Sequence, residues 1–231
     1  MAAVADKVIV VTGAARGLGR AYASALAADG AKIVAGDVRD SAETVSAIES
    51  AGGDAKAITL DVSDTASCMA MATAAIEAYG RIDGIINNAA HYGGQASGKA
   101  DALDEQEWQR VMDVNVSGVW RCCKAVIPHM RDGGGGSIIN IASLAAVYGM
   151  PNALHYATSK AAVIGMTRSM ARELGRNWIR VNAIAPSAVM TEGTEEFFGE
   201  RLEKAKQIIA GGQSLQRNLE TDDLVGTVRY L

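Results

Sequence analysis

Short apolar runs alternate along the chain with longer stretches of helical spacing. The runs are rich in β-branched residues and almost continuously apolar, which is typical of strands buried on both faces of a parallel sheet. The alternation predicts a doubly wound α/β fold, a parallel sheet flanked by helices in three layers. We expect strands at Lys7–Thr12, Ala31–Ala35, Ala57–Leu60, Ile82–Asn87, Ser137–Ile141 and Ile179–Ala183, and helices at Gly17–Ala28, Ser41–Ala51, Thr65–Tyr79, Leu103–Met130, Ala153–Leu174 and Asp222–Leu231.

The pattern gives no sign of a domain boundary within residues 1–231. The sequence holds three prolines and no linker rich in serine and proline. Only Thr191–Gly212 breaks the strand–helix rhythm, because it is charged, encloses Phe197 and Phe198, and follows Pro186. Such segments at the carboxyl edge of a sheet often close over a ligand. We therefore predict a single domain with a substrate lid at residues 191–212.

The composition excludes several classes of function. The net charge is −4, whereas nucleic-acid binders usually carry a basic patch or stripe. No apolar run approaches the roughly 18–20 residues that span a bilayer, and the N-terminus shows no secretory signal. The cysteines, Cys68, Cys122 and Cys123, are odd in number and lack zinc-ligand spacing. We expect a cytoplasmic protein with reduced thiols, no metal, and no nucleic-acid or membrane partner.

A glycine-rich turn links the first predicted strand to the first predicted helix. The stretch Thr12–Arg20 places Gly13, Gly17 and Gly19 in a G-x-x-x-G-x-G spacing. Glycine at these positions permits a tight turn, close approach of a pyrophosphate and close packing of the helix, whose N-terminus favours phosphate. A glycine cluster alone also fits an ordinary turn, but the strand–turn–helix context favours a dinucleotide site.

The end of the second predicted strand indicates which dinucleotide binds. Asp37 follows Gly19 by 18 residues, near the spacing at which a carboxylate bonds the adenine-ribose hydroxyls. A 2′-phosphate would meet that carboxylate at close range, so Asp37 favours NAD. Arg16 and Arg39 favour the opposite choice, because a guanidinium can pair with a 2′-phosphate. We give the carboxylate more weight and predict NAD, with NADP as the other possibility.

A second motif indicates acid–base chemistry. Tyr156 and Lys160 begin a predicted helix, and a spacing of four puts both side chains on one helix face. A nearby ammonium lowers the pKa of a phenol, so Tyr156 could exchange a proton near neutral pH. Tyr-x-x-x-Lys is also common by chance as a helix-surface pair. Ser143, just past a predicted strand, offers a hydroxyl that could hold a substrate oxygen.

These motifs, in this order, resemble those of the short-chain dehydrogenase/reductase family across almost the whole chain. Thr12–Gly19 is similar to that family's T-G-x-x-x-G-x-G, and Tyr156-x-x-x-Lys160 to its catalytic pair. The glycine spacing is that of the short, single-domain branch. Further matches are Asp61-Val62, which holds the adenine in that family, the stretch Asn87-Asn88-Ala89-Ala90, the helix asparagine Asn115, the serine Ser143 and the nicotinamide segment Pro186–Thr191.

The resemblance implies a Rossmann-like domain that transfers a hydride between a nicotinamide cofactor and a secondary alcohol or its ketone. Tyr156 would act as the acid and base, tuned by Lys160, which would also bind the ribose. Ser143 would position the substrate oxygen, and Asn115 would hold a water of a proton relay. The implied cofactor-binding residues are Gly13, Arg16, Gly17, Leu18, Gly19, Asp37, Val38, Asp61, Val62, Asn88, Ala89, Ala90, Tyr156, Lys160, Pro186, Val189 and Thr191.

Three positions depart from the family pattern. Ala90 and Ser187 stand where the family has glycine; we expect a small effect of Ala90 if its backbone is ordinary, and an altered turn at Ser187. The chain also stops at Leu231, before a final strand with a T-G-x-x-x-x-V-D-G-G pattern. We expect a sheet without that edge strand, and its exposed edge favours an incomplete chain over a natural short form.

The sequence constrains the substrate less than the chemistry. The candidate substrate contacts are Ser143, Tyr156, Tyr92, His155 and Met190. Plain packing is the alternative role for the aromatic residues, and a structural hydrogen bond for His155. An apolar pocket built by such residues would suit a cyclic or aromatic secondary alcohol.

The sequence allows two alternative functions, and the resemblance implies an oligomeric state. An NADPH-dependent 3-oxoacyl-thioester reductase is disfavoured by Asp37, and a non-catalytic dinucleotide sensor is disfavoured by the presence of Tyr156 and Lys160. The resemblance also implies a homotetramer, formed through the long helices at Leu103–Met130 and Ala153–Leu174.

Overall fold

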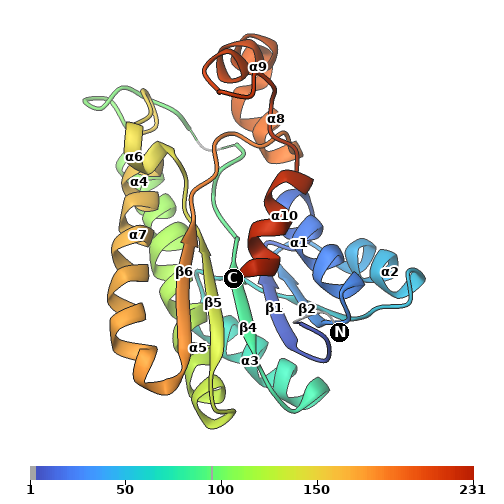
Figure 1. The fold of residues 1–231 in the computed structure, drawn as a ribbon. Coiled ribbons are helices and arrows are strands. Elements are labelled where there is room, and N and C mark those ends of the chain that lie inside the picture. The colour runs from blue at the N-terminus through green and yellow to red at the C-terminus, as the bar shows by residue number, and fades with distance from the viewer. Residues whose placement is uncertain (1–3, 95) are drawn as a thin grey trace.

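One sheet lies at the centre of the molecule. Among residues 4–94 and 96–231, which the computed structural model describes, it has six parallel strands in the order β3-β2-β1-β4-β5-β6 (Figure 1). This confirms the predicted doubly wound fold. The strands are β1 (Val8–Thr12), β2 (Lys32–Asp37), β3 (Asp54–Thr59), β4 (Gly84–Asn87), β5 (Gly136–Ile141) and β6 (Ile179–Ile184).

Helices cover both faces of the sheet. The first face packs against α3 (Thr65–Tyr79), α5 (Gly118–Asp132) and α7 (Leu154–Leu174), and the second against α1 (Gly17–Ala28), α2 (Ala42–Ser50) and α10 (Asp222–Tyr230). Figure 1 shows α8 (Glu192–Phe198) and α9 (Leu202–Gly211) standing above the end of the sheet. The remaining helices are α4 (Glu105–Met112) and the short α6 (Ala145–Tyr148).

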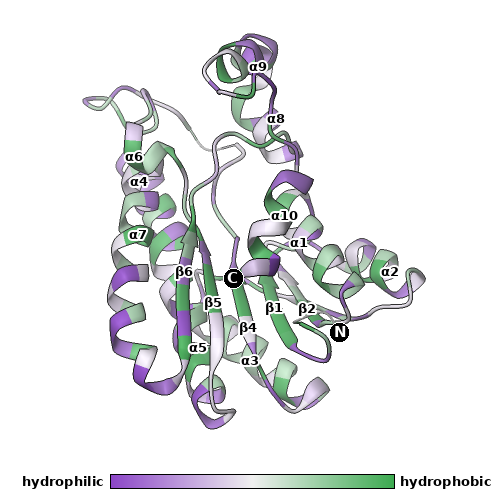
Figure 2. Cartoon of the chain, in the orientation of Figure 1, coloured by the Kyte–Doolittle hydropathy of each residue, from purple (hydrophilic) through white to green (hydrophobic). Residues whose placement is uncertain are grey.

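The residues of β1 show why a central strand is almost continuously apolar. Val8 and Val10 pack into the core on the α3, α5 and α7 side, whereas Ile9 and Val11 pack into the core on the opposite side. Successive side chains of a strand point to opposite faces, so a strand covered on both faces needs an apolar residue at every position. Figure 2 shows this as hydrophobic colour along most of β1.

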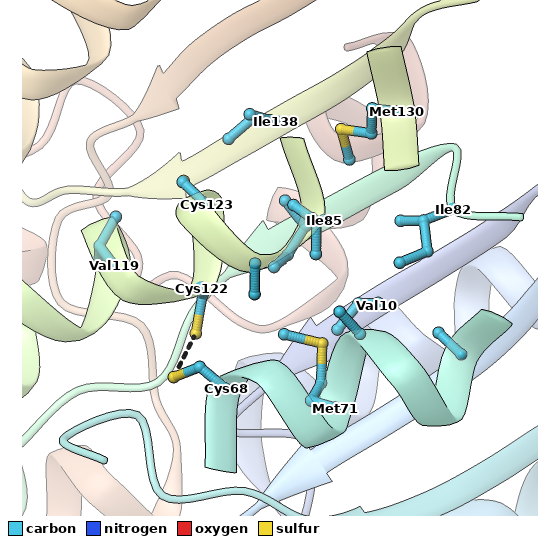
Figure 3. Packing of buried hydrophobic residues seen from close by; sticks show 14 of the residues in the cluster. Val10, Cys68, Met71, Ile82, Ile85, Val119, Cys122, Cys123, Met130 and Ile138 are labelled. Atoms are coloured by element: carbon cyan, nitrogen blue, oxygen red, sulfur yellow. Dashed lines mark hydrogen bonds between the residues drawn. The ribbon is translucent and has the colours of Figure 1, made fainter. Parts of the chain in front are cut away.

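The buried thiols lie in the core on the α3 side. Cys68 of α3 and Cys122 of α5 face each other with 3.7 Å between their sulfur atoms (Figure 3), and Cys123 contacts the Nδ2 of Asn87 at 3.3 Å. All three cysteines are free and buried among residues such as Met71. They fill space as small apolar side chains.

The predicted strands and helices are largely in place, and the differences have physical reasons. The third strand begins at Asp54 and not at Ala57. It lies at the sheet edge and is mostly exposed, so its first residues include polar ones that lack the apolar pattern of a buried strand. The long helix predicted from Leu103 to Met130 is interrupted by a π-helical turn, Asp113–Ser117. Residues 191–212, for which no element was predicted, contain α8 and α9.

The strand order places a crevice at the carboxyl edge of the sheet. The chain runs outward from β1 to β2 and β3, then returns to pair β4 with the other side of β1. The chain that leaves β1 enters α1 on one face of the sheet, whereas the chain that leaves β4 leads to α5 on the other face, and in doubly wound sheets ligands bind at this point.

Candidate active site

One cavity of about 1080 Å³ follows the carboxyl edge of the sheet. The loops after all six described strands contribute to its wall, with residues that include Gly13, Val38, Leu60, Asn88, Ala142 and Pro186. An elongated cavity of this size can hold a ligand that reaches from one half of the sheet to the other.

Most of the sequence-predicted site residues line this cavity. The structure does not bring four of them to its wall, namely Gly19, Asn115, His155 and Met190. Those at the wall are Gly13, Arg16, Gly17, Leu18, Asp37, Val38, Asp61, Val62, Asn88, Ala89, Ala90, Tyr92, Ser143, Tyr156, Lys160, Pro186, Val189 and Thr191.

The glycine-rich turn has the shape of a phosphate cradle. Gly13 and Gly17 have φ of 68° and 55°, a region that other residues rarely adopt. A Cβ on Gly13 would lie 2.9 Å from the Ala89 Cα. Among the described residues no side chain caps α1, so the N–H groups of its first turn remain available to an anion. The cradle fits a dinucleotide pyrophosphate.

Gly19 serves packing and not the cavity wall. A Cβ there would lie 1.9 Å from the carbonyl oxygen of Gly13 and 2.8 Å from the Nδ2 of Asn88. That Nδ2 donates to the carbonyl oxygens of Thr12 (3.1 Å) and Gly13 (3.2 Å). Because Gly19 has no side chain, α1 can pack closely against the glycine-rich turn and the loop after β4.

The Asp37 carboxylate is fixed at the end of β2. Its Oδ2 accepts the N–H of Ala15 at 3.0 Å, and its Oδ1 accepts the N–H of Arg39 at 2.9 Å. Each carboxylate oxygen can accept further hydrogen bonds. The Asp37 carboxylate thus contacts Ala15, the residue before Arg16 in the sequence. It can still accept hydrogen bonds from a ribose at the cavity wall.

Tyr156, Ser143 and Lys160 meet at the other end of the cavity. Tyr156 is buried beside Ser143, whose Oγ accepts the N–H of Ala145 at 3.1 Å. The Nζ of Lys160 donates to the Ile141 carbonyl at 2.7 Å and lies 5.8 Å from the centroid of the Tyr156 ring. An acid–base side chain, a hydroxyl and an ammonium thus share one wall.

The protonation of this group differs from the sequence-based expectation. Lys160 does not lower the pKa of Tyr156 in this structure: burial raises that pKa, against the smaller effect of the Ser143 hydrogen bond. Burial also lowers the pKa of Lys160 to about 8, and its ammonium is directed to the Ile141 carbonyl. Tyr156 is therefore held as a neutral phenol, the form that donates a proton.

Asn115 is a positioning residue behind the cavity wall. It lies in the π-helical turn, a rare conformation that often marks functional sites. Its Oδ1 accepts the N–H of His91 at 2.7 Å, and its Nδ2 donates to Ser159 Oγ at 3.2 Å. Ser159 Oγ in turn donates to the Tyr156 carbonyl at 2.7 Å. The buried amide ties the loop after β4 to the helix that carries Tyr156.

Two predicted substrate contacts are not supported by the structure. His155 is fully buried, and within the described part of the chain neither ring nitrogen has a hydrogen-bond partner, so it makes neither of the expected contacts. Met190 forms a backbone bond to Leu219 (2.8 Å) while its side chain stays off the wall. Both neighbour true wall residues in sequence, which is why sequence adjacency suggested them.

Tyr92 joins the catalytic end of the cavity to α8. Its ring lies 5.2 Å from that of Tyr156, centroid to centroid, and stacks on Phe197 at 4.8 Å with an interplanar angle of 11°. Phe197 meets Phe198 edge to face. Offset and edge-to-face pairs of this kind are favourable. A continuous aromatic contact therefore links residues 191–212 to Tyr156.

Sequence reasoning missed two residues that organise the site. Thr12 Oγ1 accepts the N–H groups of both Asn88 and Ala89 at 3.0 Å, and so joins the loops after β1 and β4. Glu196 of α8 forms an ion pair with Arg16 of the cavity wall. The sequence does hold a signal for Thr12, because this residue begins the glycine motif. It holds none for the Arg16–Glu196 pair, because the two residues are 180 positions apart.

Two departures from the family pattern are structurally mild. Neither Ala90 nor Ser187 is among the described non-glycine residues with positive φ, which are Asp6, Asn152 and Trp178. Ala90 thus avoids the left-handed backbone region, the condition under which we expect its extra methyl to have a small effect. Ser187 follows Pro186, whose carbonyl accepts the N–H of Leu144 at 2.9 Å, so this segment is anchored beside Ser143.

The family model for short chain dehydrogenases matches residues 7–201, and this span contains the cradle and the Tyr156 group. The chain belongs to the short-chain dehydrogenase/reductase family. The predicted enzyme class, a nicotinamide-dependent oxidoreductase acting on CH–OH groups, is confirmed with it. Across the described residues, no helix is long and apolar enough to cross a membrane, and no cluster of three His, Cys, Asp or Glu is suited to a metal.

Relatives within this short-chain dehydrogenase/reductase family span nearly the whole chain. The short-chain reductase protein NovJ of Streptomyces niveus is 43% identical over 85% of this chain and 74% of its own. A 3-oxoacyl-acyl-carrier-protein reductase of Thermotoga maritima is 34% identical over 97% and 89%. The structure of carveol dehydrogenase from Mycobacterium avium in complex with NAD is 31% identical, covers 100% and 92%, and has a TM-score of 0.93.

The packing role of Gly19 predicts a specific loss. We expect Gly19→Ala to weaken NAD⁺ binding at least about tenfold, or about 1.4 kcal/mol, because the added methyl displaces the cradle. Titration calorimetry measures it. Gly226→Ala in α10, where a Cβ meets no atom within 4 Å, is the matched control. Equal affinities of the two variants would contradict the role of Gly19.

The buried ammonium predicts a pH effect on stability. The pKa of Lys160 is about 8 in the folded protein and ordinary in the unfolded chain, so the unfolded chain binds more protons between these values. The free energy of unfolding should therefore rise with pH above about 8, by at most about 1.4 kcal/mol per pH unit. Urea unfolding of cofactor-free protein near pH 7.5, 8.5 and 9.5 should show this rise in the wild type and not in Lys160→Met. Parallel profiles would contradict it.

Proposed function

We propose that the protein catalyses reversible, NAD-dependent oxidation of a cyclic or aromatic secondary alcohol to its ketone. The observation that carries this proposal is a single cavity with Asp37 at one end and Tyr156, Ser143 and Lys160 at the other. The carboxylate and the acid–base group are thus set at the two ends of a cofactor-sized space, with the phosphate cradle between them.

The cofactor would lie along the sheet edge. The cradle at Gly13 and Gly17 would hold the pyrophosphate, and Asp37 would accept bonds from the adenine ribose. Asp61 and Val62, at the cavity wall after β3, would hold the adenine, and Val189 and Thr191 would lie beside the nicotinamide. When bound, the nicotinamide ring accepts the carbinol hydrogen as a hydride and returns it in the reverse direction.

The proton moves through Tyr156. In the reducing direction its neutral phenol donates a proton to the carbonyl oxygen, while Ser143 hydrogen-bonds to the same oxygen. In the oxidising direction Tyr156 has to act as the phenolate to accept the hydroxyl proton, and the Lys160 ammonium would lower the pKa of the phenol by turning from the Ile141 carbonyl towards it. Asn115 acts through Ser159 by holding the helix that carries Tyr156 in place.

The wall around the catalytic end favours an apolar substrate. Leu144, Tyr148 and Met150 line it from the α6 side, and Phe198, Ile208 and Ile209 from residues 191–212. The acidic and arginine side chains of the cavity wall gather at the other end, at Arg16, Asp37, Arg39 and Asp61. A substrate with several charges would find few partners beside Tyr156.

Residues 191–212 have the properties of a lid. No residue of α9 is buried, although its Ile208 and Ile209 line the cavity. Ile208 is 66% exposed, so α9 offers the cavity apolar surface that a bound substrate would cover. We propose that α8 and α9 close over the bound substrate.

A 3-oxoacyl-thioester reductase that uses NADPH is the second candidate. Two observations favour it: Arg16 and Arg39 line the adenine end, and the Thermotoga maritima relative carries that name. The same apolar wall would accept an acyl chain. Cofactor preference separates the two candidates, since Asp37 opposes a 2′-phosphate.

The assembly and location remain proposals. Trp120 of α5 and Leu154 of α7 are 48% and 43% exposed, so the helices expected to form the tetramer carry uncovered apolar side chains. The three free thiols support a reducing, cytoplasmic location.

Loss of the phenol tests the catalytic assignment. We expect Tyr156→Phe to lower kcat at least about 100-fold, because it removes the proton-transfer group. The affinity for NAD⁺ should stay within about twofold, which calorimetry measures. Tyr230→Phe, at a tyrosine that is 86% exposed, controls for the substitution itself. Near-normal turnover of Tyr156→Phe with NAD⁺ bound would overturn the assignment.

Removal of the carboxylate tests the cofactor assignment. We expect Asp37→Ala to shift the ratio of NADP⁺ to NAD⁺ affinity towards NADP⁺ by about tenfold, since repulsion of the 2′-phosphate is lost. Asp40→Ala removes a carboxylate three residues away that does not line the cavity. An unchanged ratio in Asp37→Ala would refute the NAD preference.

A further inference from the structure

An ion pair joins Arg16, a cavity-wall residue of the phosphate turn, to Glu196 of α8. Arg16 precedes the first turn of α1, and its guanidinium meets the carboxylate of Glu196 in a two-pronged contact: Nη2 to Oε2 at 2.7 Å, and Nη1 to Oε1. The two residues are 180 positions apart in the sequence. A fork of this geometry occupies both terminal nitrogens of the arginine.

The surroundings of the pair are acidic. The hydrogen bond to Glu196 raises the pKa of Arg16, and the charges of Glu192 and Asp37 act in the same direction. Arg39 is the other cation that acts on Glu196. Three carboxylates therefore surround two guanidinium groups at the place where the adenine ribose would lie.

The pair decides whether Arg16 can receive an anion. Arg16 stands beside Asp37, because the N–H of Ala15 donates to the Asp37 carboxylate at 3.0 Å. A 2′-phosphate near Asp37 would need a free guanidinium as its partner. With Glu196 in place, Arg16 is committed to α8, and the phosphate would have to displace one carboxylate while facing another.

We propose that Glu196 is a specificity-determining residue that excludes NADP by sequestering Arg16. This inference rests on the proposed NAD preference and adds a second determinant to it. Glu196 acts through Arg16 and is a positioning residue, since its carboxylate contacts the arginine guanidinium. Because Glu196 belongs to α8, the choice of cofactor is tied to the position of the lid.

Glu195 provides a matched control. It is exposed on the same helix, carries the same charge and adjoins Glu196 in sequence. Its side chain has no ion-pair partner among those found in the described residues. Glu196→Gln and Glu195→Gln therefore change the net charge of α8 equally, and only the first releases Arg16.

Calorimetric titration of the substrate-free protein with NAD⁺ and with NADP⁺ tests the proposal. We expect Glu196→Gln to tighten NADP⁺ binding about three- to fivefold, the scale of a half-exposed ion pair, and to change NAD⁺ binding by less than about twofold. Glu195→Gln should change neither. The gain should vanish in Arg16→Gln/Glu196→Gln and should shrink at high salt.

Three outcomes would overturn the proposal: equal effects of Glu196→Gln on both cofactors, the same gain in Glu195→Gln, or a gain that survives without Arg16. A different result would show that the proposed NAD preference is wrong. In that case the wild type binds NADP⁺ as tightly as NAD⁺, whatever Glu196→Gln does.

Discussion

The contact between the loops after β1 and β4 is the constraint on which the site depends. Thr12 Oγ1 accepts the N–H groups of Asn88 and Ala89, and the Asn88 side chain bonds back to the carbonyl of Gly13. These bonds fix the phosphate turn at the crossover of the sheet. Because Gly13 and Gly19 carry no side chain, the loops approach closely enough to form them. A Cβ at either position would separate the loops and move the cradle relative to Tyr156.

From that point the cavity extends in two directions of different chemistry. Towards β2 it is charged, with Asp37 held by two backbone N–H groups beside the Arg16–Glu196 pair. Towards β5 and β6 it is apolar and encloses Tyr156, whose pKa burial raises. Helix α8 contacts both ends, because it carries Glu196, the partner of Arg16, and Phe197, the stacking partner of Tyr92. One short helix thus contacts both the part of the cavity where the adenine would bind and the part that holds Tyr156.

The sequence predicted the fold well because buried parallel strands leave a strong signal. The four apolar residues Val8–Val11 of β1 fill two cores, and α1 and α3 were predicted with the bounds observed. The edge strand β3 was placed three residues late, since half of that signal is missing at an exposed edge. The π-helical turn left no signal, because its residues still have helical spacing.

The site was predictable where chemistry is local in sequence. The glycine turn, Asp37 and the Tyr156–Lys160 pair lie at fixed spacings, and the structure brings them to one cavity. Tertiary contacts were not accessible in this way. The Arg16–Glu196 pair joins distant segments, the Lys160 ammonium turns to the Ile141 carbonyl, and His155 points into the protein although it adjoins Tyr156.

The most direct test is the initial rate of reduced-nicotinamide formation with a panel of aliphatic, cyclic and aryl secondary alcohols, each offered NAD⁺ and NADP⁺. We expect turnover of cyclic or aryl alcohols, faster with NAD⁺ than with NADP⁺. Turnover with NADP⁺ alone, or no turnover of any alcohol by protein that binds NAD⁺, would contradict it.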